Sequence, residues 1–425
     1  MNTFSEFSET DPIAPRGDAV ASPPRWIGCV VGLSSGIFAV AMGMVVSALG
    51  NSRTSLDLVG SSFIDRTPLW LKEQAIQTFG TNNKTALEVG MIGVLILASG
   101  VLGLLSRKSL TPLQIGIVAF GILGAASAFE HAGTGFISVI APLCGVVAGL
   151  FAAHRLHGYL TTQRKLSRTP QQSRVPLGWD RRSFIRTVGA LGALSGGGVL
   201  FARSREQARV QQLQDLTQTP LPPLATSNIP VAAITDFHPT DPYITPNDNF
   251  YRIDTALSFP RVDRAKWKLR IHGLVEREKL FSLDDLQALP QVERIITLCC
   301  VSNEVGGPYI GNAVWRGVLL KDVLESCGIN KDAEQVFTTS LDGWTSGFPV
   351  SAALDGRDAL IAIGMNGQSL PLMHGYPARL VVPGLYGYVS ATKWLSEINI
   401  TTWSAEQGYW IPRGWSRDAP IKTQS

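Results

Sequence analysis

Three short segments in the second half of the chain carry residue types that suit redox or anion chemistry. The first is the segment 297–303, in which Cys299 and Cys300 are adjacent and follow a stretch typical of a strand. A cysteine thiolate is a soft ligand for redox metals, and successive side chains of an extended chain point to opposite sides. At most one of the two cysteines can therefore face a given site. A pair of core cysteines, or a vicinal disulfide, is the alternative.

The second segment combines glycines with cations. His374, Arg379 and Lys393 lie in or just after the sequences HGYPAR and PGLYG. Glycines let the backbone approach a ligand closely, and arginine, histidine and lysine together can bind a phosphate. A turn-rich loop with surface cations is the alternative. The third segment, residues 249–254, places Arg252 among aromatic residues, and a surface salt bridge is its default interpretation.

The elements that must position these segments are short strands and short helices. The pattern predicts strands at 266–271, 294–298 and 380–382 from alternation or buried apolar runs. It predicts a helix that begins after Ser282 and another at 319–326 that stops at Gly328. This mixture indicates an α+β domain. Because neither GxGxxG nor a P-loop is present, dinucleotide and nucleotide triphosphate binding lack support.

The first half of the chain reads as membrane helices. About 20 apolar residues span the ~30 Å of hydrocarbon in a bilayer. Four segments meet this requirement and a fifth is shorter and glycine-rich: 26–49, 86–105, 113–129, 135–153 and 187–202. At ~1.5 Å per residue the fifth reaches about 24 Å, which is marginal. These spans contain no polar pair at similar depth that would indicate an ion path or a haem, so an anchor is the expected role.

Charge supports the membrane interpretation and sets an orientation. Only 16% of the 425 residues are charged, and residues 1–203 carry 17 Lys and Arg against 10 Asp and Glu. The basic half is also the apolar half, which favours a membrane protein over a nucleic-acid binder. With the N-terminus in the cytoplasm, the inner segments hold 12 cations and the outer loops hold 4. Five helices then place the C-terminal half outside the cytoplasm, at the plasma membrane.

The residues before the fifth helix also indicate on which side of the membrane the C-terminal half lies. The segment 180–186 resembles a twin-arginine export signal, with Arg181 and Arg182 followed by an apolar pair and Arg186. If the fifth segment were only a buried apolar stretch, the C-terminal half would lie in the cytoplasm instead. The expected organisation is a cytoplasmic tail at 1–25, a transmembrane anchor at 26–203, a proline-rich linker at 204–249 and a catalytic domain at 250–425.

Taken together, the three segments resemble the molybdopterin-binding domain of the sulfite oxidase family. The shared pattern is FxR, then TLxC with an asparagine three residues after the cysteine, then HGxPxRxVVPGxxG and KW. The resemblance extends from about Asn249 to Trp415. The anchor and the twin-arginine helix look like the membrane-bound bacterial branch of this family. The resemblance implies molybdopterin and molybdenum as cofactors and Cys300 as the molybdenum ligand, with Cys299 pointing away.

The resemblance also implies roles for residues at matching positions. Cys300, Arg252 and Trp415 would be the catalytic residues. The residues that would bind the cofactor are Phe250, Tyr251, Arg252, Ile253, Asp254, Asp342, His374, Arg379, Ala391, Thr392 and Lys393. Asp342 is the weakest match because its loop is shorter than in sulfite oxidases.

Three departures from the family concern the substrate. Asn303 is followed by Glu304 and Val305 where sulfite oxidases have arginines, and Trp415 stands where they have a tyrosine. The chain ends about where their immunoglobulin-like dimerisation domain would begin. These departures disfavour a small dianion such as sulfite and favour an uncharged or larger oxo donor, such as a sulfoxide.

The sequence thus predicts a multi-pass membrane helical half of about five helices and an α+β sulfite oxidase-like molybdopterin-binding domain. The expected function is oxygen-atom transfer with two electrons on a small substrate outside the cytoplasm. The expected partners are a small oxo donor or acceptor, membrane lipid, and a separate electron-transfer partner or a membrane quinone; no nucleic acid is expected. The alternative is a membrane-tethered binding or sensor module with a degenerate, metal-free pterin-domain fold.

Overall fold

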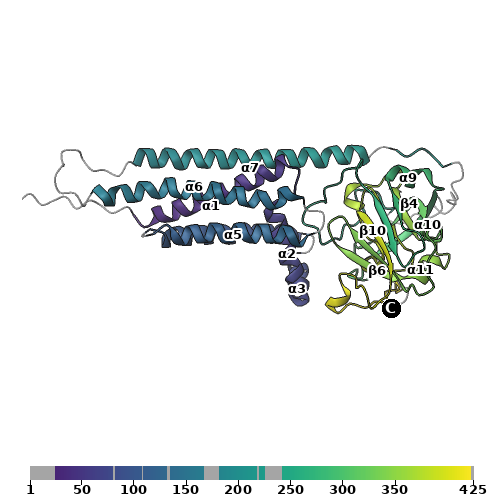
Figure 1. Cartoon of the computed structure of the whole chain (residues 1–425). Helices are drawn as coiled ribbons and strands as arrows, with labels where there is room; N and C mark the ends of the chain where they lie inside the picture. Colours follow the sequence, from purple (N-terminus) through teal and green to yellow (C-terminus); the bar gives the residue numbers. More distant parts are fainter. Residues whose placement is uncertain are drawn as a thin grey trace, which may run out of the picture.

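The computed structural model describes residues 24–79, 82–107, 109–131, 135–166, 181–217, 220–224 and 242–422. A helical bundle forms one end of the elongated molecule and a sheet-containing domain forms the other (Figure 1). The helices of the first half are α1 (Trp26–Leu49), α2 (Ser55–Arg66), α3 (Leu69–Phe79), α4 (Asn83–Leu105), α5 (Thr111–Glu130), α6 (Phe136–Leu166) and α7 (Arg181–Thr217).

Five of these helices, α1, α4, α5, α6 and α7, are long and apolar enough to cross a membrane. The predicted helical half with about five long apolar helices is therefore confirmed. The fifth helix is much longer than its apolar segment: α7 has 37 residues and ends at Thr217. Residues 203–217 contain neither proline nor glycine and are rich in helix formers, so the helix continues past the apolar stretch. Figure 1 shows α7 running along the whole bundle to the sheet-containing domain.

Small residues let the helices of the bundle approach closely. A Cβ added at Gly32 of α1 would lie 2.0 Å from the carbonyl oxygen of Ser99, and one at Gly103 of α4 would lie 2.2 Å from the carbonyl oxygen of Gly28. Backbone-to-backbone contact of this kind is how apolar helices associate when lipid removes the hydrophobic driving force. Any larger side chain at Gly32 or Gly103 would separate α1 from α4.

Two short helices occupy the segment between α1 and α4, where the sequence pattern predicts only an outer loop. The Thr54 side chain accepts a hydrogen bond from the Asp57 backbone, and the Asp57 carboxylate accepts one from the Thr54 backbone, which is a capping box that starts α2. Figure 1 places α2 and α3 at the end of the bundle that faces the sheet-containing domain. This position brings them next to the candidate site.

The second half contains two five-stranded sheets and short helices. One sheet has the order β2-β1-β10-β5-β6; the other has β3-β4-β7-β8 with β9 paired to β7. The strands are β1 (Leu269–Gly273), β2 (Lys279–Phe281), β3 (Val292–Cys299), β4 (Ile310–Leu319), β5 (Gln335–Ser340), β6 (Thr345–Pro349), β7 (Leu360–Met365), β8 (Gln368–Ser369), β9 (Arg379–Val381) and β10 (Leu395–Thr401). The helices are α9 (Leu283–Ala288), α10 (Leu320–Cys327), α11 (Val350–Leu354), α12 (Gly387–Ser390), η2 (Leu372–His374) and η3 (Ile411–Arg413).

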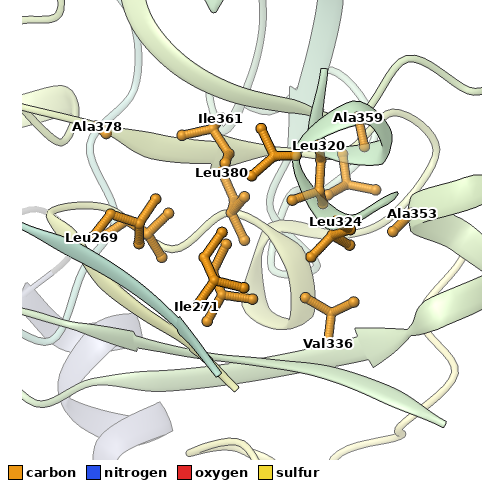
Figure 2. Close-up of a cluster of buried hydrophobic side chains, with 14 of the residues drawn as sticks. Leu269, Ile271, Leu320, Leu324, Val336, Ala353, Ala359, Ile361, Ala378 and Leu380 are labelled. Atoms are coloured by element: carbon orange, nitrogen blue, oxygen red, sulfur yellow. The ribbon is translucent and has the colours of Figure 1, made fainter. Parts of the chain in front are cut away.

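The main core lies where the two sheets and α10 meet. Ile271 of β1, Leu324 of α10 and Ile361 of β7 are each fully buried in one cluster, and Figure 2 shows such side chains pointing toward one another. The predicted starts and stops hold for the helices: Ser282 caps α9 through a capping box with Asp285, and Gly328 caps α10. The alternating pattern predicts a strand that begins at residue 266, but β1 begins only at Leu269.

Several predicted boundaries fall on residues that the structure does not describe. The cytoplasmic tail is described only for residues 24 and 25, Asp180 of the twin-arginine-like motif lies outside the described residues, and so do 218–219 and 225–241 of the linker. Residues 204–217 of the predicted linker are helical, as part of α7.

Candidate active site

A cavity of about 1040 Å³ brings the three chemistry-bearing segments together. Nearly all the site residues predicted from the sequence line it: Phe250, Tyr251, Arg252, Ile253, Asp254, Cys300, Asp342, His374, Arg379, Ala391, Lys393 and Trp415. Thr392 does not. Its buried hydroxyl lies 2.7 Å from the Thr338 hydroxyl and 2.8 Å from that of Ser346, so it fixes the backbone between two lining residues.

Cys300 lies immediately after β3, and a closed loop holds it at the cavity wall. Its backbone N–H donates to the carbonyl of Tyr309 (2.9 Å), and its carbonyl accepts from the Asn303 backbone (3.0 Å). The Asn303 side chain accepts from the Tyr309 backbone (2.7 Å), which ties the loop to the start of β4. Cys299 is buried and is not among the lining residues. Burial raises the pKa of the Cys300 thiol, so a bound metal would have to displace its proton.

The segment that begins at Phe250 forms a wall of aromatic rings beside Cys300. Phe250 is buried; its ring packs edge-on against Trp315 (5.7 Å between centroids) and His374 (5.5 Å). The same ring stacks on Tyr251 (5.2 Å). Burial raises the pKa of Tyr251, so its phenol stays neutral and can only donate or accept a hydrogen bond. These contacts fix the backbone from which Arg252 extends.

A buried carboxylate organises three cations. Asp254 has a side chain only 6% exposed, and it binds Lys393 (2.5 Å), Lys84 (2.5 Å) and Arg252 (2.9 Å). Burial alone would raise the pKa of Asp254, but Lys393, Lys84 and Arg252 outweigh burial and hold that pKa well below its ordinary value. Burial lowers the pKa of Lys393 to about 8, although Asp254 opposes the shift. One carboxylate against three cations leaves this cluster positive.

Arg379 adds a further buried positive charge. Its guanidinium donates to the backbone carbonyls of Leu380 (3.3 Å), His374 (3.0 Å) and Ala391 (3.4 Å), and it lies over the Trp315 ring. Among the described residues no carboxylate forms an ion pair with it. Burial lowers the pKa of Arg379 to about 10, which still leaves it charged at neutral pH. A buried cation on a cavity wall is suited to an anionic ligand.

His374 stays neutral within this cluster. Its Nε2 lies 2.9 Å from the carbonyl of Asn247, to which it donates in the tautomer that satisfies both groups. Burial lowers the pKa of His374 to about 4, and the nearby Arg379, Lys393 and Arg252 add to the shift. The following residue, Gly375, has φ +113°, which disfavours any other residue, and a Cβ there would lie in tight contact, 3.1 Å from atoms of both Arg379 and Lys393. The glycine therefore keeps the two cations close together.

The far side of the cavity is aromatic. Trp415 stacks on Trp410 (4.5 Å) and meets the Tyr388 ring edge-on (4.9 Å). Tyr388 and Tyr309 line the cavity together with Trp410, but no motif in the sequence predicts either tyrosine as a site residue. Tyr388 lies five residues before Lys393 in a glycine-rich stretch, and this nearness was the only available clue. Asp342 also lines the cavity, where its carboxylate accepts from the Trp344 backbone (3.1 Å) and closes a turn.

The helical half contributes directly to this site. Lys84, at the start of α4, binds Asp254 and also donates to the carbonyl of Ala256 (2.6 Å). Lys72 of α3 lies over the rings of Tyr409 and Trp410, at 5.5 Å and 5.7 Å. The Tyr409 hydroxyl donates to Asp65 of α2 (2.9 Å). No sequence motif marks these contacts, because they arise from tertiary packing between segments over 150 residues apart.

A cation-lined cavity with one thiol suits a domain that binds an anionic, metal-containing cofactor. Residues 256–410 match the family described as "Oxidoreductase molybdopterin binding domain". The "Uncharacterized oxidoreductase YuiH" of Bacillus subtilis is 35% identical over 153 residues, which are 36% of this chain and 74% of that protein. Sulfite oxidase of Arabidopsis thaliana is 32% identical over 42% of this chain and 52% of its own length. The sulfane dehydrogenase SoxCD of Paracoccus pantotrophus has 24% identity and a TM-score of 0.35, over 43% of this chain and 51% of that one.

The chain therefore belongs to the sulfite oxidase-like family of molybdopterin-binding oxidoreductases, as predicted. It spans about half the length of the Arabidopsis sulfite oxidase. Membership implies molybdopterin and molybdenum as cofactors, and the observed donors fit them. Cys300 offers a thiol to a metal at the cavity wall, and Arg379 offers a buried guanidinium to a phosphate.

Proposed function

We propose that this chain is a membrane-anchored molybdopterin oxidoreductase that exchanges one oxygen atom and two electrons with a small substrate. The observation that carries the proposal is the convergence of Cys300, Arg252 and the buried, carboxylate-free Arg379 on one cavity. Family membership supports the enzyme class, and this arrangement supplies both a soft metal ligand and an anion site.

The residues of the site would have different roles. Cys300 would bind molybdenum through its sulfur, while Arg379, Lys393 and neutral His374 would hold the pterin and its phosphate. When bound, the cofactor supplies the two-electron oxygen-atom transfer. Arg252 is held by Asp254 and lies 4.4 Å from the Phe259 ring centroid, so it presents a fixed positive charge to an oxygen that gains negative charge during the reaction.

The substrate we favour is an uncharged oxo donor such as a sulfoxide. Trp415, Trp410 and Tyr388 form an apolar wall with aromatic faces, which suits a thioether-like group better than a dianion. Asn303 is followed by Glu304 and Val305, so the arginines that sulfite oxidases carry after this asparagine are missing. The relatives named as sulfite oxidases make sulfite the competing candidate.

We further propose that α1, α4, α5, α6 and α7 span the plasma membrane and that the pterin domain lies outside the cytoplasm. The surplus of cations on the predicted inner segments and the twin-arginine-like segment at 180–186 support this orientation. Along the chain, the proposed order is a cytoplasmic tail, a transmembrane anchor, a linker and a catalytic domain. Replacing Arg181 and Arg182 by lysine should leave the pterin domain protected from protease added to intact spheroplasts.

The test uses the full chain purified from a host that makes the cofactor. We expect about one molybdenum and one pterin per chain. Reduced methyl viologen should support reduction of methionine sulfoxide faster than ferricyanide supports oxidation of sulfite. The absence of both metal and pterin would refute the enzyme proposal and favour the sensor alternative. Faster sulfite oxidation would refute only the substrate.

A further inference from the structure

The cavity that holds Cys300 does not end at the pterin domain. It continues between the helices of the first half, where residues of α1, α2, α3, α4, α5 and α6 line it. Gly90 and Met91 of α4 and Phe120 of α5 are examples, and Lys84 marks the passage from the helices to the charged cluster. One continuous space therefore joins the membrane-spanning helices to the redox site.

The two ends of this space differ in chemistry. The end at the pterin domain presents Lys84, Arg252, Lys393 and the phenol of Tyr309. The helical end is lined mainly by leucine, valine, methionine, phenylalanine and glycine, with Ser99 of α4 among them. An occupant that suits both ends has a polar head and a long apolar tail.

We propose that this channel binds a membrane quinone, with its head beside Lys84 and its tail between α4 and α5. The inference rests on the proposed function and names its electron partner. A quinol is a lipid-soluble carrier of two electrons and two protons, which is the amount that one oxygen-atom transfer consumes. With XO as the oxo donor, the balanced reaction is QH₂ + XO → Q + X + H₂O. The quinol is oxidised, the donor is reduced, and the two quinol protons leave in the water.

Two glycines of α4 provide a matched test. Gly90 lines the channel and Gly93 does not, yet a Cβ added at either meets nothing within 4 Å. A phenylalanine at Gly90 would therefore extend from a lining position without clashing with the protein, whereas one at Gly93 would extend from a position that does not line the channel. Both substitutions place the same side chain on the same helix, so their effects on helix propensity and membrane insertion should match.

The experiment titrates decylubiquinone into the full chain in phosphatidylcholine nanodiscs and follows the quenching of tryptophan fluorescence. Trp344, Trp410 and Trp415 line the cavity, so a bound quinone head should quench them. We expect saturable quenching in the wild type, an affinity about tenfold weaker in Gly90→Phe, and no change in Gly93→Phe. In Gly90→Phe, the rate of decylubiquinol-dependent reduction of the oxo donor should fall together with the quinone affinity. The rate of viologen-dependent reduction should stay at the wild-type level.

Quenching that does not saturate would overturn the inference and leave lipid chains as the occupant of the channel. Equal affinity in the Gly90→Phe and Gly93→Phe variants would overturn it as well. Molybdenum and pterin contents are measured on the same samples. A loaded protein that is active with viologen but does not bind quinone would refute the quinone site alone. A protein without metal or pterin would refute the proposed function, and the quinone titration would still decide whether the channel binds its ligand.

Discussion

Replacing His374 by glutamine should remove a defined part of the pH dependence of stability. The His374 ring is only 1% exposed and donates to the carbonyl of Asn247, a bond that a glutamine amide can also form. Burial lowers the pKa of His374 from the ordinary 6.5 to about 4. Between these two values the unfolded chain binds a proton that the folded chain does not. The stability that neutral His374 permits is therefore fully present above pH 6.5 and is lost as the pH falls toward 4.

The size of the effect follows from these two pKa values. Lowering the pH from 7 to 5 should reduce the free energy of unfolding of the wild type by about 2 kcal/mol more than that of His374→Gln. For a domain of this size such a loss lowers the Tm by about 4–8 °C. Differential scanning calorimetry of the cofactor-free protein in detergent, at both pH values, measures the difference between wild type and variant.

The same measurement on cofactor-loaded protein adds a second test. A phosphate beside the cluster of Arg379, Lys393 and Arg252 would favour protonated His374 and raise its pKa. Binding of the cofactor should therefore reduce the difference between the wild type and His374→Gln in the pH dependence of the free energy of unfolding. Identical pH dependence in the cofactor-free wild type and variant would show that His374 is not buried in neutral form, and the electrostatic description of the site would be wrong.

Two further substitutions test the charged cluster. Lys84→Met removes a cation from the buried Asp254 and should lower the Tm by about 4–8 °C. Lys266→Met, at a lysine whose side chain is 86% exposed, should leave the Tm unchanged. A Tm of Lys84→Met equal to that of the wild type would refute the contact between the halves. Arg379→Gln should lower pterin occupancy about tenfold because charge-assisted hydrogen bonds are lost; Arg294→Gln, outside the cavity, should retain it, and full occupancy in Arg379→Gln would remove the phosphate role from Arg379.

The sequence predicts the elements whose causes are local. The apolar stretch of α1 matches the predicted segment 26–49, because length and hydropathy alone decide whether a helix can span a bilayer. Ser282 and Gly328 mark helix ends because capping depends on a few neighbouring residues. The end of α7 at Thr217 was missed, because a polar helix carries no apolar run to reveal it.

The residues of the candidate site also fall into two groups: those within local motifs and those brought to the site by tertiary packing. Cys300, Arg252 and His374 lie within short motifs, and the resemblance of those motifs to the sulfite oxidase family predicts that the three residues share one site. Lys84 and Lys72 approach the site through the packing of α3 and α4 against the pterin domain, and no local pattern encodes that contact. The helical half, expected to be only an anchor, therefore also supplies part of the cavity wall.

The most direct test of the central claim is the sulfur coordination of molybdenum in the purified full chain. X-ray absorption at the molybdenum edge would compare the wild type with Cys300→Ser and Cys299→Ser. We predict that Cys300→Ser loses one sulfur ligand or the metal itself, whereas Cys299→Ser keeps the wild-type coordination, since only Cys300 lines the cavity. Unchanged sulfur coordination in Cys300→Ser, or the loss of a sulfur ligand in Cys299→Ser alone, would contradict the site described above.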